Sequence, residues 1–209
     1  IHIASGGIYA NNLRKAAFRA QINAEKMTRQ RSSFVPCLMV QDFRLDGHND
    51  YLFLGNEISA YVKSKGGSVF ELDHIPKAWN YLDTMARRKE PYVSQDCVQD
   101  ELHRSAFMDF LLPPDLSFRD ASHSSFLFSR QCAREFYEQI ELDRVKQTLV
   151  LRLHPSSQGA FSSIELIKRY SLTKSLLTVS YCLLNQGNSV ERFNFSPRID
   201  LSLADEIQL

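Results

Sequence analysis

The chain has 209 residues and carries 25 basic against 24 acidic side chains, a formal net charge of +1. This length is sufficient for one large domain with its own hydrophobic core. The even charge balance argues against a dedicated nucleic-acid binder, which usually shows a basic excess. No apolar run approaches the roughly 20 residues of a membrane span, and no secretory signal is visible. We therefore expect a globular protein with neither nucleic acid nor membrane as a partner.

The spacing of the cysteines indicates the cellular compartment. Cys37, Cys97, Cys132 and Cys182 are far apart, and no two of them form a C-x-x-C pair. In a chain that can build its own core, isolated cysteines are typical of buried small hydrophobic residues in a reducing compartment. The close ligand spacings of zinc sites are missing. We expect a cytoplasmic protein with no metal and no cofactor.

The first predicted element is a helix over residues 8–30, with Asn11 or Asn12 as its cap. Apolar residues recur at helical spacing in a narrow stripe of small side chains: Leu13, Ala16, Ala17, Ala20, Ala24 and Met27. We expect this stripe to face inward against a close helical neighbour, which nothing else in the chain supplies. The other face carries Arg14, Lys15, Arg19, Lys26 and Arg29. We expect that face to be solvated or to dock another module's acidic surface; phosphate binding is the less favoured alternative.

From residue 37 onward the pattern changes to strands and turns. Asp46-Gly47 lies between two apolar runs and predicts a hairpin, and Ile58, Ala60 and Val62 alternate on one strand face. Further strands are expected at 68–73, 125–129, 147–153, 163–172, 175–184 and 198–203. The segment 98–112 fits either a short helix or an irregular crossover. About nine strands with short connections predict a mainly β fold, an antiparallel sandwich or barrel.

Two carboxylates, Glu71 and Asp73, lie two residues apart on a predicted strand, so both point to one face. Their backbone separation of roughly 6–7 Å lies in the range of glycosidase carboxylate pairs, about 5–9.5 Å. However, any strand with E-x-D shares this spacing, and no neighbour explains how one carboxyl would have a raised pKa. We favour the alternative, a structural polar cluster in which these acids bond Arg87, Arg88 or nearby backbone amides.

Sugar contacts have two candidate locations. Trp79, with Tyr81 and Tyr92, could stack on a sugar ring or fill the edge of the core, and we favour the core. A second set surrounds the glycine pair before the helix: His2, Gly6, Gly7 and Tyr9. Those glycines permit close backbone approach, and the helix start offers free amide hydrogens, so this set could line a ligand cleft.

Several segments resemble glycoside hydrolase family 57, the α-amylases and 4-α-glucanotransferases. "GGIYANNLRKAAFRAQINAE" (6–25) resembles the end of that family's helical middle region. Residues 42–92, with "FELD" and "NYLDTMARRKEPY", look like the opening of its C-terminal domain, and 104–113 and 167–185 fit later parts more loosely. The resemblance implies that residues 1–33 end a helical middle domain. It also implies that residues 34–209 form a large twisted antiparallel β-sandwich, galactose-mutarotase-like and incomplete at its end.

This resemblance implies a non-catalytic C-terminal portion of a retaining enzyme that processes α-1,4-glucans. The family's catalytic carboxylates lie on an N-terminal (β/α)₇ barrel, so no catalytic residue is carried over to this chain. The implied partners are that barrel and α-1,4-glucan, and a homo-oligomer stays open. The family's Trp-His-Gly and Gly-Gly-Tyr contacts match His2, Gly6, Gly7 and Tyr9, with Ile1 in place of the tryptophan. Because residue 1 is not methionine, we expect a piece of a longer protein.

Two alternatives remain open from the sequence. The first is a free-standing carbohydrate-binding or interaction module. The second is a mutarotase-like sugar epimerase, which needs a His/Glu acid–base pair on the concave face of the sandwich. The histidines that could serve there are His74, His103 and His154.

Overall fold

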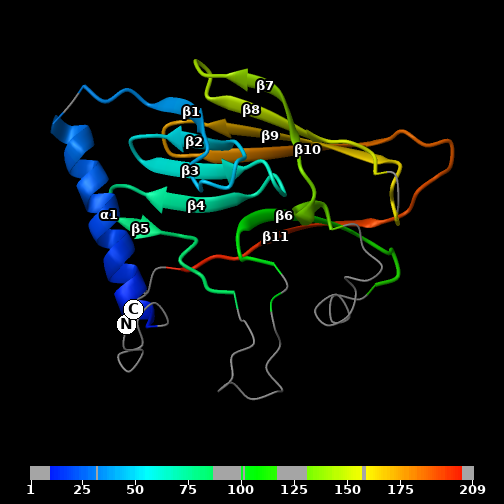
Figure 1. Ribbon diagram of the computed structural model, residues 1–209, viewed down its shortest axis with the longest axis horizontal. Helices are drawn as coiled ribbons and strands as arrows, with labels where there is room; N and C mark the ends of the chain where they lie inside the picture. The colour runs from blue at the N-terminus through cyan, green and yellow to red at the C-terminus, as the bar shows by residue number, and fades with distance from the viewer. Residues whose placement is uncertain are drawn as a thin grey trace.

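The computed structural model describes residues 10–31, 33–86, 100, 102–116, 131–156 and 159–203. Within these ranges one α-helix precedes eleven strands (Figure 1). The elements are α1 (Asn11–Arg31), β1 (Cys37–Gln41), β2 (Asp50–Leu54), β3 (Ile58–Lys63), β4 (Val69–His74), β5 (Trp79–Asn80), β6 (Ala106–Leu112), β7 (Glu138–Asp143), β8 (Thr148–Leu153), β9 (Ile164–Leu172), β10 (Leu177–Asn185) and β11 (Asn194–Ile199). No helix in the described ranges is long and apolar enough to cross a membrane.

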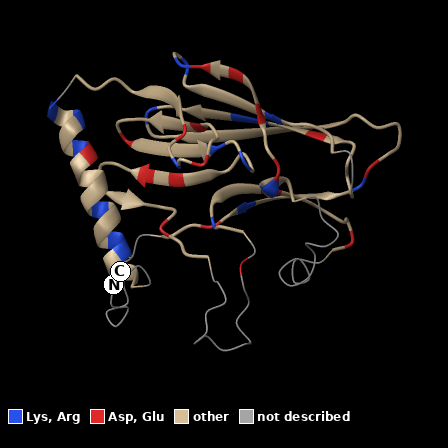
Figure 2. Cartoon of the chain, in the orientation of Figure 1, with Lys and Arg blue, Asp and Glu red and all other residues tan. Residues whose placement is uncertain are grey.

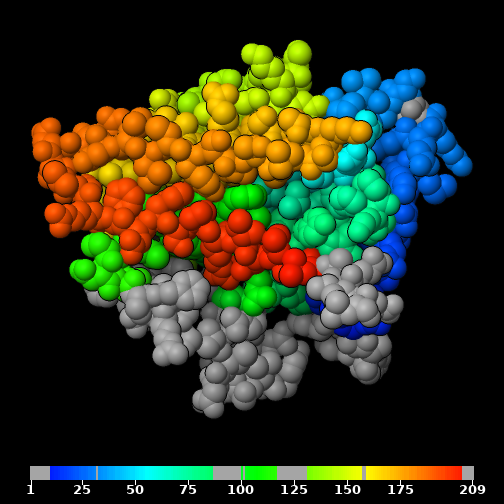
Figure 3. All heavy atoms as spheres, turned by 180° about the vertical axis from the view of Figure 1, so that it is seen from behind, coloured from blue at the N-terminus to red at the C-terminus, as the bar shows by residue number. Residues whose placement is uncertain are grey.

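The strands form two stacked antiparallel sheets. The large sheet has the order β1-β2-β3-β4-β6-β11, with β5 paired to β4, and the small sheet has the order β10-β9-β8-β7. Seen from behind, β10 and β11 run side by side along the surface although they belong to different sheets (Figure 3). Tyr181 and Phe195 connect these two strands, with ring centroids 5.0 Å apart. The predicted mainly β, antiparallel fold is confirmed.

The hydrophobic core lies between the two sheets. Phe53 and Val62 of the large sheet are fully buried there, as are Leu149 and Leu166 of the small sheet. Ala60 is also fully buried, and it shares its strand face with Val62 as the alternation predicted. Burial of this apolar area is the main favourable term that holds the sheets together.

A buried ion pair also joins the two sheets. Lys168 of β9 places its Nζ 2.6 Å from Oδ2 of Asp109 on β6, and it donates to the carbonyls of Gly67 at 2.7 Å and Phe107 at 2.6 Å. Burial raises the pKa of Asp109 and lowers the pKa of Lys168, while their mutual contact opposes both shifts. Three tyrosine rings lie 5.4–5.6 Å from the ammonium: Tyr137, Tyr170 and Tyr181. The three oxygen acceptors, from Asp109, Gly67 and Phe107, match the three protons of the buried ammonium.

The helix packs with the opposite face from the one predicted. Its buried residue is Ile22, which contacts Ile75 and Ala78 of the β4–β5 connection. The stripe expected to face inward is exposed along its length, including Leu13 and Met27. Most of the basic face, expected to be solvated or to dock another module, turns toward the sheet instead, and only Arg19 of its five residues is exposed. It does so because long basic side chains can reach acceptors at the sheet rim, as Arg14 Nε does 2.7 Å from Asp83 Oδ1.

Some strand predictions were also wrong or incomplete. The segment 98–112, predicted as a helix or crossover, contains strand β6. The last strand lies at 194–199 and not at 198–203, and Pro197 within it is tolerated because β11 is an edge strand. Strand β7 was not predicted, since its alternation is hidden by charged residues on an exposed edge. The strand predicted at 125–129 lies outside the described residues.

The cysteines follow the expectation only in part. Cys132 is buried as expected, Cys37 is half-buried and Cys182 is exposed on β10, so the prediction was wrong for Cys182. An outward position on an edge strand explains that exposure, because successive side chains alternate between the two faces. Cys97 lies outside the described residues.

Candidate carboxylate site beneath the helix

The two carboxylates singled out in the sequence do lie together on one face of β4. In the register with β3, Glu71 pairs with Tyr61 and Asp73 pairs with Ser59. These four side chains occupy the outer face of the large sheet, on the side that α1 covers. Figure 2 shows the acidic positions of β4 beside the helix. Side chains of the helix therefore reach the candidate site from one side.

Hydrogen bonds connect this site to α1 and to β5. Asn80 Nδ2 of β5 donates to Asp73 Oδ1 at 2.8 Å. From the helix, Arg29 donates to Glu25 Oε2 at 2.9 Å, to Ser59 Oγ at 3.1 Å and to the carbonyl oxygen of Gly55. The guanidinium of Arg29 thus interacts with the carboxyl groups of Glu25 and Asp73.

Burial and this crowding of acids change the proton affinity of the pair. Burial, with the charge of Glu25, raises the pKa of Glu71 to about 7, although a hydrogen bond with Asp73 opposes the shift. Burial, with the charge of Glu71, raises the pKa of Asp73 to about 8, opposed by the hydrogen bond from Asn80. At neutral pH the pair therefore retains a proton between its two carboxyl groups.

The raised pKa values overturn the expectation that nothing nearby could shift them, because that expectation did not include the helix. A raised pKa is one requirement for a general acid, but access to substrate is another. Asp73 is only 1% exposed. A hollow of about 210 Å³ at the helix end involves neither carboxyl and is lined by Lys26, Arg29, Gln30, Asn56, Ile75 and Pro76. Asp73 is therefore closed to a substrate, while Glu71 is half-buried, so the two carboxyl groups cannot both reach one glycosidic bond.

The other predicted partners of the pair cannot be placed. Arg87 and Arg88 lie outside the described residues, as does Tyr92. The partners that the structure does show, Asn80 and the helical pair Glu25–Arg29, were not predicted. The i,i+4 spacing of Glu25 and Arg29 was the available signal for the helical pair.

Trp79 lies on β5 with its ring half-buried. Its Nε1 donates to the carbonyl oxygen of Ser202 at 3.1 Å, and Lys15 Nζ of α1 lies 4.9 Å from the ring centroid. Part of the indole therefore already contacts α1 and the segment that follows β11. The remaining predicted sugar contacts, His2, Gly6, Gly7 and Tyr9, lie outside the described residues.

The histidines of the epimerase alternative occupy ordinary structural positions where their contacts can be described. His74 Nδ1 accepts from the amide of Lys77 at 3.2 Å. His154 Nε2 lies 2.7 Å from Glu138 Oε2, but both side chains are more than half exposed. Arg152 and His154 lower the pKa of Glu138, which keeps this carboxylate charged. Such an arrangement is typical of a surface ion pair.

A metal site has no support in the part of the chain that the structure describes. No group of three or more His, Cys, Asp or Glu side chains in those ranges could hold a metal ion.

Comparison with known proteins places the central segment in a defined domain. Residues 42–96 match the family model described as α-amylase/4-α-glucanotransferase, C-terminal. This segment of the chain is thus similar to the C-terminal domain of those enzymes. Glu71, Asp73 and Trp79 lie inside the matching segment, which includes β2 to β5.

The relatives that this chain matches are much longer than the chain itself. An α-amylase of Pyrococcus horikoshii is 29% identical over 203 residues, which are 88% of this chain and 29% of the relative. A 4-α-glucanotransferase of Thermococcus kodakarensis is 34% identical over 93 residues, 44% of this chain and 13% of the relative. The crystal structure of 4-α-glucanotransferase from Thermococcus litoralis superposes with a TM-score of 0.76 at 21% identity. That superposition covers 94% of this chain and 30% of the other, and it shows a shared fold.

Proposed function

We propose that this chain is the non-catalytic C-terminal portion of a protein that processes α-1,4-glucans by a retaining mechanism, in glycoside hydrolase family 57. The observation that carries the proposal is the match of residues 42–96 to the C-terminal domain of α-amylases and 4-α-glucanotransferases. The burial of Asp73 supports it, because a retaining mechanism needs two carboxyl groups at the glycosidic bond and substrate cannot reach this one.

The proposed partner is a catalytic barrel in the same polypeptide. Residues 1–33 would end a helical middle domain, and residues 34–209 would form the β-sandwich. The outward apolar stripe of α1 supports this division, since a helix with an exposed apolar stripe gains stability from a neighbour that covers it. In this proposal the sandwich holds α1 by one face while the middle domain packs on the other.

Contacts to glucan and the cellular location are further parts of the proposal. His2, Gly6, Gly7, Tyr9 and Trp79 are proposed sugar contacts on the basis of the family resemblance. A cytoplasmic location is proposed from the scattered cysteines, of which Cys37, Cys132 and Cys182 are not in disulfides.

The experiment that tests the proposal is to sequence the complete reading frame that encodes this chain and to express the whole product. We expect a long upstream region with a barrel and a pair of accessible carboxylates, and turnover of maltooligosaccharides by the whole protein. Glu71→Gln in the whole protein should leave kcat within about twofold, because a surface or scaffold change far from the chemistry removes no transition-state contact. A frame without a catalytic region would contradict the proposal.

A further inference from the structure

The loop between β1 and β2 is held by its own side chains. Asp42 accepts hydrogen bonds from the amides of Asp46 at 2.9 Å and Gly47 at 2.8 Å, and Asp46 Oδ1 accepts from the amide of His48 at 3.1 Å. Gly47 has a φ of 83°, which favours glycine. Three amides that a loop would normally leave to water are thus bonded to carboxylates, so the loop has one preferred conformation.

Arg44 fastens this loop to the sheet. Its Nε lies 3.0 and 3.2 Å from the two carboxylate oxygens of Asp50, and its Nη1 lies 3.0 Å from Asp46 Oδ2. Asp50, at the start of β2, is fully buried. A charge-assisted pair with a buried carboxylate holds its geometry better than an exposed pair does. Arg44 therefore positions the loop relative to β2.

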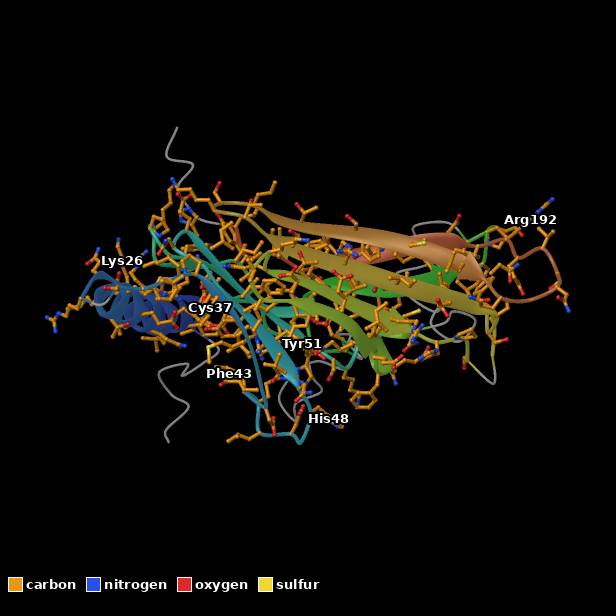
Figure 4. The ribbon with its side chains drawn as sticks, turned by 90° about the horizontal axis from the view of Figure 1, so that it is seen from above. Lys26, Cys37, Phe43, His48, Tyr51 and Arg192 are labelled. Carbon is orange, nitrogen blue, oxygen red and sulfur yellow. The ribbon has the colours of Figure 1, made fainter. Side chains whose placement is uncertain are left out.

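The fixed loop exposes apolar side chains. Leu45 is 87% exposed, and its φ of 56° lies in the left-handed region that a leucine rarely adopts. Phe43 is 43% exposed and rests edge-on against Tyr61, with centroids 5.2 Å apart. Figure 4 shows Phe43 and His48 projecting from the same side of the molecule.

A second exposed ring extends this surface. His48 stacks on Phe136 with ring centroids 4.5 Å apart, and Phe136 is 49% exposed. Lys65 forms an isolated β-bridge with Phe136 and places its Nζ 5.6 Å from the ring centroid. The loop and the segment before β7, far apart in sequence, therefore join in one surface of rings and charged groups.

We propose that Phe43, His48 and Phe136, here named the aromatic surface, bind an α-1,4-linked glucan chain. The inference rests on the proposed function, and it adds a glucan contact apart from the glycine pair and Trp79. Exposed rings on the fixed loop and on the segment before β7 present apolar faces on which the C–H faces of pyranose rings can pack at little entropic cost. The charged groups beside them, Lys65 and Asp46, can hydrogen-bond the sugar hydroxyls.

The chemistry of the aromatic surface favours a sugar over a protein partner. Its apolar atoms are interrupted by the charged side chains of Arg44, Asp46 and Lys65. A stable protein interface usually buries a contiguous patch with an apolar centre, about 800 Å² on each partner. Isolated rings flanked by donors and acceptors suit a ligand that has alternating apolar faces and hydroxyl edges.

The test is isothermal titration of the full chain with maltoheptaose, with cellohexaose as the β-linked control. We expect millimolar or tighter binding of maltoheptaose and much weaker binding of cellohexaose. Phe43→Ala and Phe136→Ala should each raise Kd about tenfold, the change that loss of one aromatic contact can produce. Phe43→Leu and Phe136→Leu remove the ring but keep the apolar bulk. If an alanine variant fails to fold, the Kd of the corresponding leucine variant is measured instead.

Two control variants sharpen the test. Leu45→Ser changes an exposed aliphatic residue of the same loop, and Val145→Ser changes an exposed residue of the β7–β8 turn; both should leave Kd unchanged. Absence of binding, equal binding of cellohexaose, or an equal loss in Leu45→Ser would each overturn the inference. Failure here leaves the proposed function standing if the reading frame contains a catalytic region. Binding in a frame without that region would instead identify a free-standing glucan-binding module.

Discussion

At the scale of single residues, Glu71 and Asp73 show how the same spacing can serve different purposes. Two carboxyl groups on one strand face have the separation that a glycosidase needs, but here Asp73 is buried and Glu71 is half-buried. Burial raises the pKa values of both groups, and Asp73 is bonded to Asn80. We interpret the pair as a proton-sharing contact on the sheet beside the helix.

The pair should make the stability of the chain depend on pH. Each pKa is raised on folding, from 4.5 to about 7 for Glu71 and from 3.8 to about 8 for Asp73, so the folded state binds more protons between about pH 4 and pH 8. The stabilisation is fully present below pH 4 and is lost as pH rises through the folded pKa values. The groups that face the pair are Tyr61 and Ser59 of β3, Asn80 of β5, and Glu25 and Arg29 of α1.

Asp73→Asn mimics the protonated side chain and should remove much of this dependence. We expect the variant to melt about 2–4 °C above wild type at pH 8.5, the shift that about 1 kcal/mol produces in a domain of this size, and to match wild type near pH 4. Thermal melts followed by circular dichroism at several pH values provide the measurement. Identical pH profiles for variant and wild type would show that the pair is ionised in the folded state.

The buried Lys168–Asp109 pair leads to a separate prediction about stability. Lys168→Met leaves the Asp109 carboxyl buried without its partner and should lower the free energy of unfolding by about 3–5 kcal/mol. Lys174→Met provides the matched control, because Lys174 is paired with Glu57 at 3.4 Å but is 83% exposed, and it should cost less than about 1 kcal/mol. Urea unfolding of the three proteins measures both values. Equal stabilities for the two variants would show that the cluster does not tie the sheets together.

At the scale of elements, α1 shows where the sequence was informative and where it was not. Helical periodicity predicted the helix within a few residues of its bounds, Asn11–Arg31. The same periodicity could not say which side faces the sheet, because the small alanine stripe and the Ile22 side are both compatible with burial. Contacts such as Arg14–Asp83 join residues distant in sequence, and no local pattern contains them.

The two faces of α1 should respond differently to substitution. Ile22→Ala removes a buried contact with Ile75 and should cost about 2–4 kcal/mol, whereas Met27→Gln on the outward stripe should change stability by less than about 0.5 kcal/mol. Trp79 fluorescence reports whether the helix stays docked, since Lys15 of α1 lies over the indole ring. Comparable costs for the two variants would mean that the stripe is covered within this chain.

The strands of the sandwich also differ in how well the sequence predicted them. Those with alternating or continuous apolar residues, such as β3, β8 and β9, were predicted close to their observed bounds. β7 and β11 were missed or displaced because edge strands carry charged residues and proline without loss of core contacts. The position of Glu71 and Asp73 on one strand face was predicted from the period-two geometry of a strand. The change in their pKa values was not, because it depends on burial and on a helix that lies about 40 residues earlier in the sequence.

At the scale of the whole molecule, we propose that the scaffold and the catalytic site lie in different parts of the protein. The two sheets and α1 form a scaffold with an exposed helical stripe and an aromatic surface, and the titratable pair that resembles an active site has one member, Asp73, buried. The chain spans about a third or less of the relatives that it resembles. In the proposed function, catalysis on glucan depends on residues outside these 209.

The most direct test of this central claim is an activity assay of the chain alone on maltoheptaose, with product analysis that detects both hydrolysis and glucan transfer. Glu71→Gln and Asp73→Asn are assayed in parallel after their folding has been checked by circular dichroism. We expect no turnover by any of the three proteins. Turnover by the wild-type chain that Glu71→Gln abolishes would contradict the account and make the carboxylate pair an active site.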